Sequence, residues 1–231
     1  MTHDEIKIKF LIEYDKANVT SSYPSLTDYE IAVILNKAYL ALLAQKVTGN
    51  NVRRAPFEAD TKAISDVQAL IHTATPSPNQ GTDGTPNSVT YNLPNDFLYY
   101  VSAIVGMTIG TKSGAATVTL IDHNVAERFK QSLVNRPWIK NAMAVIESNK
   151  LVLFYDNYDN DDPGTDPKVP GNLNLKYIKR PAVFTQSFGT TQFELNDSMA
   201  EELITLAVTF ALENIESTRL QSQVQTRGLE A

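Results

Sequence analysis

The acidic stretch DNYDNDDPGTD, residues 156–166, holds the residue types best suited to binding a metal ion. Its Asn157, Asp159 and Asp161 match the first, third and fifth ligand positions of a calcium-binding loop. The sixth position is Asp162, where such a loop needs glycine, and the twelfth is a lysine in place of a bidentate glutamate. We therefore interpret the stretch as a solvated hairpin tip and predict no metal site.

Three histidines could act as acids, bases or metal ligands, but none has a motif neighbour. We interpret His3 as part of the terminal tail, His72 as a surface residue at a helix end, and His123 as the start of a short helix. The sequence contains no G-x-S-x-G elbow, no H-E-x-x-H pair and no Walker loop. It therefore predicts no catalytic, cofactor-binding or metal-binding residue, no cofactor, and a protein that is not an enzyme.

The remaining chemically distinctive residues are two basic pairs and one tryptophan. Arg53-Arg54 and Lys179-Arg180 are the tight basic pairs, and we interpret each as a surface or intersubunit ion-pairing site rather than a phosphate site. Trp138, in NRPWIK, follows a predicted helix and is interpreted as a core residue.

Composition narrows the class of protein. The chain has 231 residues, a formal net charge of −6 and no cysteine. The charge argues against a broad nucleic-acid-binding face, and the missing cysteine excludes disulfides and thiolate metal sites. No segment resembles a signal peptide or is long enough to span a bilayer. We expect a soluble intracellular product.

The N-terminal part predicts helices. Residues 3–15 carry Ile6, Phe10 and Tyr14 at a helical spacing, although IKIKF alternates like a strand, and we favour a helix. Residues 27–50 form a second helix, with Thr27 and Glu30 as a capping box and Gly49-Asn50 after its end. That helix has two apolar stripes and needs packing partners on both: Ile31, Ile34, Leu35, Ala38 and Leu42 form one, and Tyr29, Val33, Leu40, Leu43 and Val47 form the other.

The middle of the chain changes character. A third helix begins near Pro56 and carries Phe57, Ile64, Val67 and Ile71 on one face. Residues 73–88, rich in breakers, predict a long exposed loop. The segments that follow predict strands and one short helix: SVTYNLP, FLYYVSAIVGMTIG and AATVTLID, the helix HNVAERFKQSL, a hairpin AMAVIE-SNK-LVLFYD that turns at residues 148–150, and NLNLKYI.

A long helix from about Ser198 to Leu220 closes the chain and is apolar around more than half of its circumference. The element order predicts an α+β fold, a helical bundle with an inserted small, mostly antiparallel β-sheet and a long C-terminal helix. The predicted parts are a bundle of residues 1–74 and 197–222, a β-rich insertion of residues 88–196 with one short helix, the loop of 73–88, and a polar tail of 222–231.

Four segments taken together resemble structural ring proteins of tailed bacteriophages, the head–tail connector or adaptor family, in particular those of crAss-like phages. The segments are YEIAVILNKAYLALL, FEADTKAISDVQALI, YNLPNDFLYYVSAIV and VNRPW. Such proteins have a helix that opens with YEI and carries an L-x-K-A step, which here fall at residues 29–31 and 35–38. A helix that starts with FE follows, here at residues 57–58. The sheet then begins with an LP-x-D-F/Y motif, here at residues 93–97. The last helix resembles that of the tail tubular protein A type of adaptor, and the resemblance covers residues 7–140 and 197–220.

The resemblance implies a virion protein without catalytic residues. Twelve copies would form a ring under the portal protein at the head–tail neck, assembled in the bacterial host cytoplasm. Genomic DNA would pass through the lumen without sequence-specific binding, which suits an acidic chain. The second stripe of residues 27–50 would contact the neighbouring subunit or the adjoining portal, neck or tail ring. The alternatives are another virion protein, for tail completion or as cargo, and a small soluble enzyme with a cryptic site in the sheet.

Overall fold

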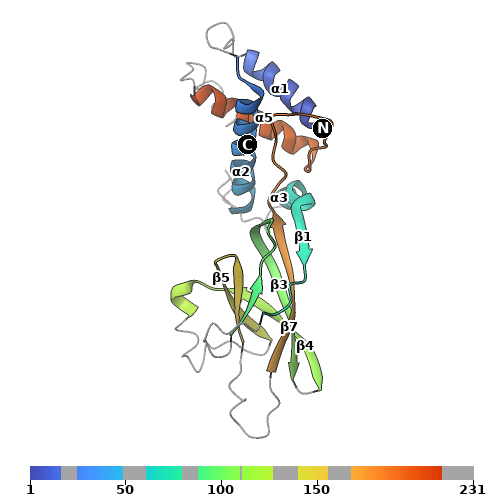
Figure 1. Ribbon diagram of the computed structural model, residues 1–231, viewed down its shortest axis with the longest axis vertical. Helices are drawn as coiled ribbons and strands as arrows, with labels where there is room; N and C mark the ends of the chain where they lie inside the picture. Colours follow the sequence, from blue (N-terminus) through green and yellow to red (C-terminus); the bar gives the residue numbers. More distant parts are fainter. Residues whose placement is uncertain are drawn as a thin grey trace. The chain divides into compact units, whose positions relative to one another are not determined.

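The computed structural model describes residues 1–16, 25–48, 61–79, 88–109, 111–126, 140–155 and 168–214. The chain divides into two compact units, coloured along the sequence in Figure 1. The helical unit comprises Met1–Leu70 and Pro181–Ala231, and the sheet unit comprises Ile71–Arg180. The insertion thus begins and ends earlier than the predicted 88–196, because residues 71–74 join the sheet and 181–196 belong to the helical unit.

The helical unit contains α1 (His3–Lys16), α2 (Asp28–Thr48), α3 (Thr61–Val67), the 3₁₀ turn η2 (Gln68–Leu70) and α5 (Asp197–Asn214). The helical interpretation of the N-terminal segment is confirmed: Ile6, Phe10 and Tyr14 lie on the buried side of α1. The predicted start of the third helix near Pro56 and the end of the last helix at Leu220 lie outside the described residues.

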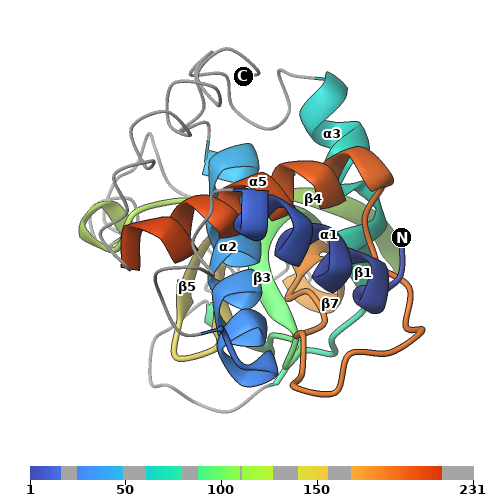
Figure 2. The same cartoon turned by 90° about the horizontal axis from the view of Figure 1, so that it is seen from above.

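Helix α5 is the central helix of this unit. It contacts both α1 and α2, which lie near it in the view of Figure 2. Asn196 caps its start, because its side-chain oxygen accepts a hydrogen bond from the Met199 backbone at 2.8 Å. Two packing partners explain why α5 is apolar over most of its circumference. Its buried residues are Met199, Ala200, Leu203, Ile204, Leu206, Ala207, Val208, Thr209, Ala211 and Leu212.

The segment before α5 supplies aromatic side chains to the helical core. Phe184 and Phe193 stack at 6.2 Å between ring centroids, and both rings lie beside the buried Tyr39 of α2. Asn36 of α2 holds the segment in place, because its amide nitrogen donates to the Phe184 carbonyl and its oxygen accepts from the Phe184 backbone nitrogen, each at 2.8 Å. Residues 181–196 therefore belong to the helical unit, and Phe184 and Phe193 belong to its core.

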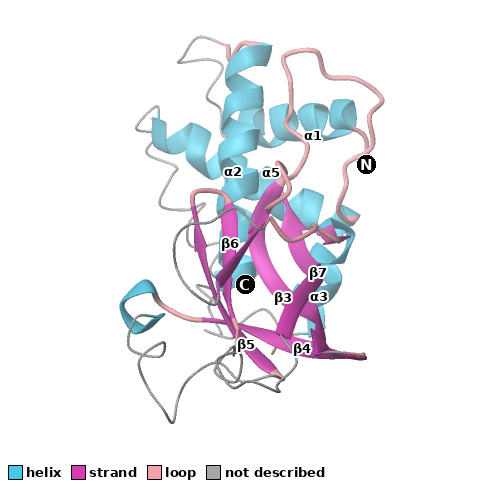
Figure 3. Ribbon diagram, turned by 60° about the horizontal axis from the view of Figure 1, so that its bottom comes forward, coloured by secondary structure: helices cyan, strands magenta, loops and turns pink. Residues whose placement is uncertain are grey.

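The sheet unit is a seven-stranded mixed sheet, magenta in Figure 3. The strand order is β1-β7-β3-β4-β5-β6-β2; the β4–β5 pair is parallel and the other pairs are antiparallel. The strands are β1 (Ile71–Ala74), β2 (Ser88–Asn92), β3 (Phe97–Ile109), β4 (Lys112–Leu120), β5 (Asn141–Glu147), β6 (Lys150–Phe154) and β7 (Lys168–Lys179).

The sheet curls into a half-barrel around its own core. Register shifts interrupt the pairing of the long strands β3 and β7, which increases local bending and twist. Across the open side, the Tyr91 hydroxyl of β2 donates to the Gly171 carbonyl of β7 at 2.7 Å. The chain after β1 also bridges the two edges, because Asn79 bonds Thr90 of β2 while the Pro76 carbonyl accepts from the backbone of β7.

The predicted fold class is wrong in its central feature. The sheet is a seven-stranded half-barrel with its own core, and it is not a small insertion in a helical bundle. The prediction missed β1, because residues 71–74 were placed at a helix end and in a loop. Their pairing partner is β7, about a hundred residues later, and local periodicity carries no information about such a partner.

Several local predictions are confirmed. The strands predicted at residues 88–94, 97–110 and 115–122 are present as β2, β3 and β4, and Leu173, Leu175 and Tyr177 of β7 are buried together. The β5–β6 hairpin turns through Ser148 and Asn149, both with positive φ. The helix predicted at residues 123–133 is described only for 123–126, where it is helical.

Candidate functional site

The candidate site is an apolar stripe on α2, whose start is set by a capping box. The Thr27 backbone nitrogen donates to the Glu30 carboxylate at 2.7 Å, and the Glu30 nitrogen donates to the Thr27 hydroxyl at 3.3 Å. The Thr27 hydrogen bonds hold the pKa of Glu30 below its ordinary value, the backbone bond contributing most. The predicted capping box is therefore confirmed, and it sets the start of α2.

One side of α2 is buried and the other carries apolar residues in solvent. The first predicted stripe is buried along its whole length. On the opposite side, Tyr29, Val33 and Leu40 are 65%, 48% and 47% exposed. At about 100° per residue these three side chains fall within about 40° of arc, so they form one continuous stripe. We call Tyr29, Val33 and Leu40 the α2 stripe.

The second predicted stripe was too long. Leu43 is fully buried and Val47 is half-buried, so the prediction that they share a free surface with Leu40 is wrong. Both α5 and α3 contact α2, and Asp66 of α3 lies 3.2 Å from Lys46 in the last turn of α2, so this end of the helix is packed against other elements of the unit.

A cluster of charged side chains lies at this junction of α2, α3 and α5. Lys46 lies 3.2 Å from Asp66 and 2.8 Å from Glu202, and the buried Asp66 also accepts from the Asn196 amide at 3.1 Å. Burial acts to lower the pKa of Lys46, but hydrogen bonds and charges of Glu202 and Asp66 raise it above 10.5. The lysine stays charged, so its ion pairs link α2 to α3 and α5. We call Lys46, Asp66 and Glu202 the ion-pair cluster.

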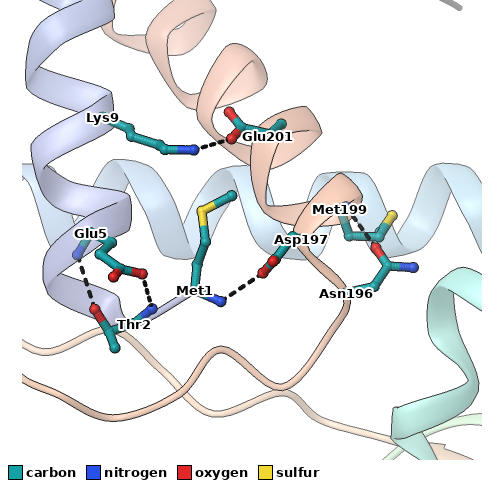
Figure 4. A network of polar contacts seen from close by, with 8 residues as sticks. All are labelled: Met1, Thr2, Glu5, Lys9, Asn196, Asp197, Met199 and Glu201. Atoms are coloured by element: carbon teal, nitrogen blue, oxygen red, sulfur yellow. Dashed lines mark hydrogen bonds and ion pairs between the residues drawn. The ribbon is translucent and has the colours of Figure 1, made fainter.

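A second set of polar contacts joins α1 to the start of α5 (Figure 4). Lys9 bonds Glu201, and the Met1 amino group lies 2.6 Å from Asp197. Thr2 and Glu5 bond each other reciprocally and cap α1. The contacts are made by exposed side chains, and their effect is to orient α1 on α5.

The three histidines are dispersed, as expected, but two of the interpretations are corrected. His3 is buried in α1 against Phe184, with ring centroids 4.4 Å apart, so it is not part of a tail. Burial lowers its pKa below 6.5. His72 is exposed, as predicted, but it lies on strand β1 and not at a helix end, and His123 does begin a helical segment.

Other candidate residues fall largely outside the described part of the chain. This applies to Arg53-Arg54, to Trp138, to the acidic stretch of 156–166 and to residues 80–87 of the predicted loop of 73–88. Of the basic pairs, Lys179-Arg180 is described and ends β7, where the Arg180 nitrogen donates to the Asp96 carbonyl at 2.6 Å. Among the described residues no three potential metal ligands lie together.

Comparison with models of known protein families gives no match for this chain, and comparison with curated protein sequences gives none either. Within the described residues, no helix has the length and apolarity required to cross a membrane.

Proposed function

We propose that this chain is a structural subunit of the head–tail connector ring in a tailed bacteriophage. In this role about twelve copies extend the portal channel, join head to tail, and let DNA pass without sequence-specific contacts. The proposal rests on the resemblance of four sequence segments to connector proteins, and it assigns no catalytic role.

The observation that carries the proposal is the α2 stripe. Three large apolar side chains face water on a helix whose other side is fully packed, within a unit that already has its own core. Apolar surface left at helical spacing on a well-packed unit is typical of a protein–protein contact. A connector subunit must bind the rings above and below it as well as its neighbours, and the stripe supplies one such surface.

The test compares two leucines on α2 that differ in burial. Leu40→Asp places a charge on the α2 stripe, and because Leu40 is half-exposed we expect a loss of about 1 kcal/mol or less in folding stability. Leu43→Asp buries a charge in the core and should cost about 4 kcal/mol or more. Circular dichroism with chemical denaturation measures both.

The functional readout is incorporation into the neck. Wild-type chain co-expressed with the portal protein of the same phage should co-purify with it, and negative-stain images should show closed rings. Leu40→Asp should leave the chain folded and abolish co-purification, because burying a charge at the contact costs several kcal/mol. Folded Leu40→Asp protein that still enters portal complexes as wild type does would refute this role for the stripe.

A further inference from the structure

His3 is a titratable residue in the core of the helical unit. It is 8% exposed and lies in the first turn of α1. Its ring packs on Phe184 with centroids 4.4 Å apart, and its backbone nitrogen donates to the Thr191 carbonyl at 2.9 Å. His3 therefore joins α1 to the segment of residues 181–196.

Two physical effects keep this imidazole neutral. Burial removes the water that would solvate an imidazolium, and it lowers the pKa of His3 below its ordinary value of 6.5. The start of a helix also carries a partial positive charge, which disfavours a further positive charge in its first turn. A proton on His3 therefore weakens the packed arrangement.

Two carboxylates near His3 oppose the effect of burial only in part. Asp4 on α1 and Glu194 in the segment of 181–196 both act to raise the pKa of His3, and burial outweighs them. Glu194 is engaged by the chain itself, because its carboxylate accepts from the Ala182 backbone nitrogen at 3.0 Å. The packed state therefore favours the neutral imidazole over the imidazolium.

The elements on the other sides of this contact add no side chain that titrates near neutral pH. Tyr39 of α2 packs on Phe184, and burial raises the pKa of its hydroxyl. At the start of α5, Asp197 is paired with the Met1 amino group at 2.6 Å. His3 is thus the described side chain of this region whose ordinary pKa lies between 5 and 7.

Phe184 connects His3 to the α2 stripe. The Phe184 backbone nitrogen and carbonyl are both bonded to the Asn36 amide, each at 2.8 Å. Asn36 lies on α2 three residues after Val33 and four before Leu40, so it is a surface neighbour of both. A movement of Phe184 away from α2 therefore breaks a contact beside the stripe.

We propose that His3 is an acid-sensitive switch: when its imidazole takes up a proton, the chain from Phe184 to Phe193 leaves the helical core. The opening is local, because α5 contacts both α1 and α2 and holds the three helices together. It exposes Phe184 and removes the two bonds to Asn36. The opening itself is a property of the helical unit, whereas its consequence for the α2 stripe rests on the proposed connector function.

The size of the effect follows from the ordinary pKa of histidine. With a pKa of 6.5 in the open state, each pH unit below 6.5 raises the open fraction by up to about tenfold. The rise stops once the pH falls below the lower pKa of the packed state. Between pH 7.5 and pH 5.5 we therefore expect a rise of several-fold, with about tenfold as its limit.

Hydrogen exchange of the full chain, read by mass spectrometry, measures the opening. Peptides covering residues 184–193 should lose protection several-fold in wild type between pH 7.5 and pH 5.5, after correction for intrinsic exchange. In His3→Phe, which keeps an aromatic ring and cannot titrate, their protection should not change. Peptides of α5 and β7 report on global unfolding and should stay protected at both pH values.

Three further variants separate titration from a packing defect. Glu194→Gln keeps an acceptor for the Ala182 nitrogen but removes a charge that raises the pKa of His3, so the loss of protection should continue to a lower pH than in wild type. His72→Asn changes an exposed histidine of β1 and should respond as wild type does. His3→Gln is neutral and smaller, and it repeats the test without a ring at this position.

Wild-type protection of residues 184–193 that is the same at pH 7.5 and pH 5.5 overturns the inference. An equal loss in wild type, His3→Phe and His3→Gln overturns it as well, since another group then titrates. Loss of protection in α5 and β7 together with residues 184–193 also overturns it, because the change is then global unfolding.

Co-purification with the portal protein at both pH values tests the consequence for the α2 stripe. Wild type should bind several-fold less at pH 5.5 than at pH 7.5, and His3→Phe should bind equally at both. Equal binding of wild type at both values overturns the link to the stripe. Exchange data as expected without portal binding at either pH leave the switch standing and refute the connector function.

Discussion

Lys46→Met tests whether the ion-pair cluster at the end of α2 stabilises the folded helical unit. Asp66 is 4% exposed and Lys46 16% exposed, so removing the lysine leaves a buried carboxylate whose one remaining partner among the described residues is the Asn196 amide at 3.1 Å. Removal of one member of a buried pair costs about 3–5 kcal/mol. Because Asn196 still donates, we expect about 2–3 kcal/mol of lost stability.

The matched control is Lys62→Met in the same cluster. Lys62 is 64% exposed and lies 3.5 Å from Glu202, so its pair is a surface pair worth at most about 1 kcal/mol. The double variant Lys46→Met with Asp66→Asn removes both charges and should recover about half of the loss. Urea denaturation followed by circular dichroism measures all four proteins.

The pH dependence adds an independent check. The pKa of Lys46 is raised in the folded protein, so the stability it contributes is fully present below its ordinary value of 10.5. That contribution is lost as the pH rises through the folded pKa. The difference between wild type and Lys46→Met should therefore be constant from pH 7 to about pH 10 and shrink above it. A difference under about 0.5 kcal/mol at pH 7, or one equal to that of Lys62→Met, would refute the reasoning.

Three smaller predictions follow from other contacts. The pKa of Glu30 is lowered by Thr27, so its contribution is present above about pH 4.5 and lost below; Glu30→Gln should flatten the acid limb of an unfolding titration there. Tyr91→Phe removes one hydrogen bond across the half-barrel and should cost about 1 kcal/mol in urea denaturation. Asn36→Ala removes both bonds to the Phe184 backbone and should cost about 2–3 kcal/mol by the same assay, with chymotrypsin cleaving near Phe184 earlier than in wild type.

Features that depend on neighbouring residues could be predicted from the sequence. The helical spacing in α1, the capping box at Thr27 and Glu30, and the alternation of Leu173 and Leu175 all appear in the structure. Each is a property of residues within a turn or a few strand positions, where backbone geometry alone decides which side chains share a face.

The α2 stripe shows that local patterns do not predict how deeply each apolar residue of a helix is buried. Leu40 and Leu43 have the same chemistry and lie three residues apart on one helix, yet one is half-exposed and the other fully buried. The difference is made by tertiary packing, in which α5 and α3 both contact α2. Periodicity could place both leucines on an apolar side, but it could not tell which part of that side another element covers.

What the sequence by itself determined was local: which segments are helical or extended and where they are capped. The tertiary structure alone decided the seven-stranded half-barrel, the pairing of β1 with β7, and the meeting of Asp66 with Lys46. These features join residues that are distant in the chain or on separate helices, and such contacts depend on which surfaces the whole fold brings together. Packing and burial decide which of these long-range contacts form, because the free energy of a contact depends on the apolar surface that it removes from water.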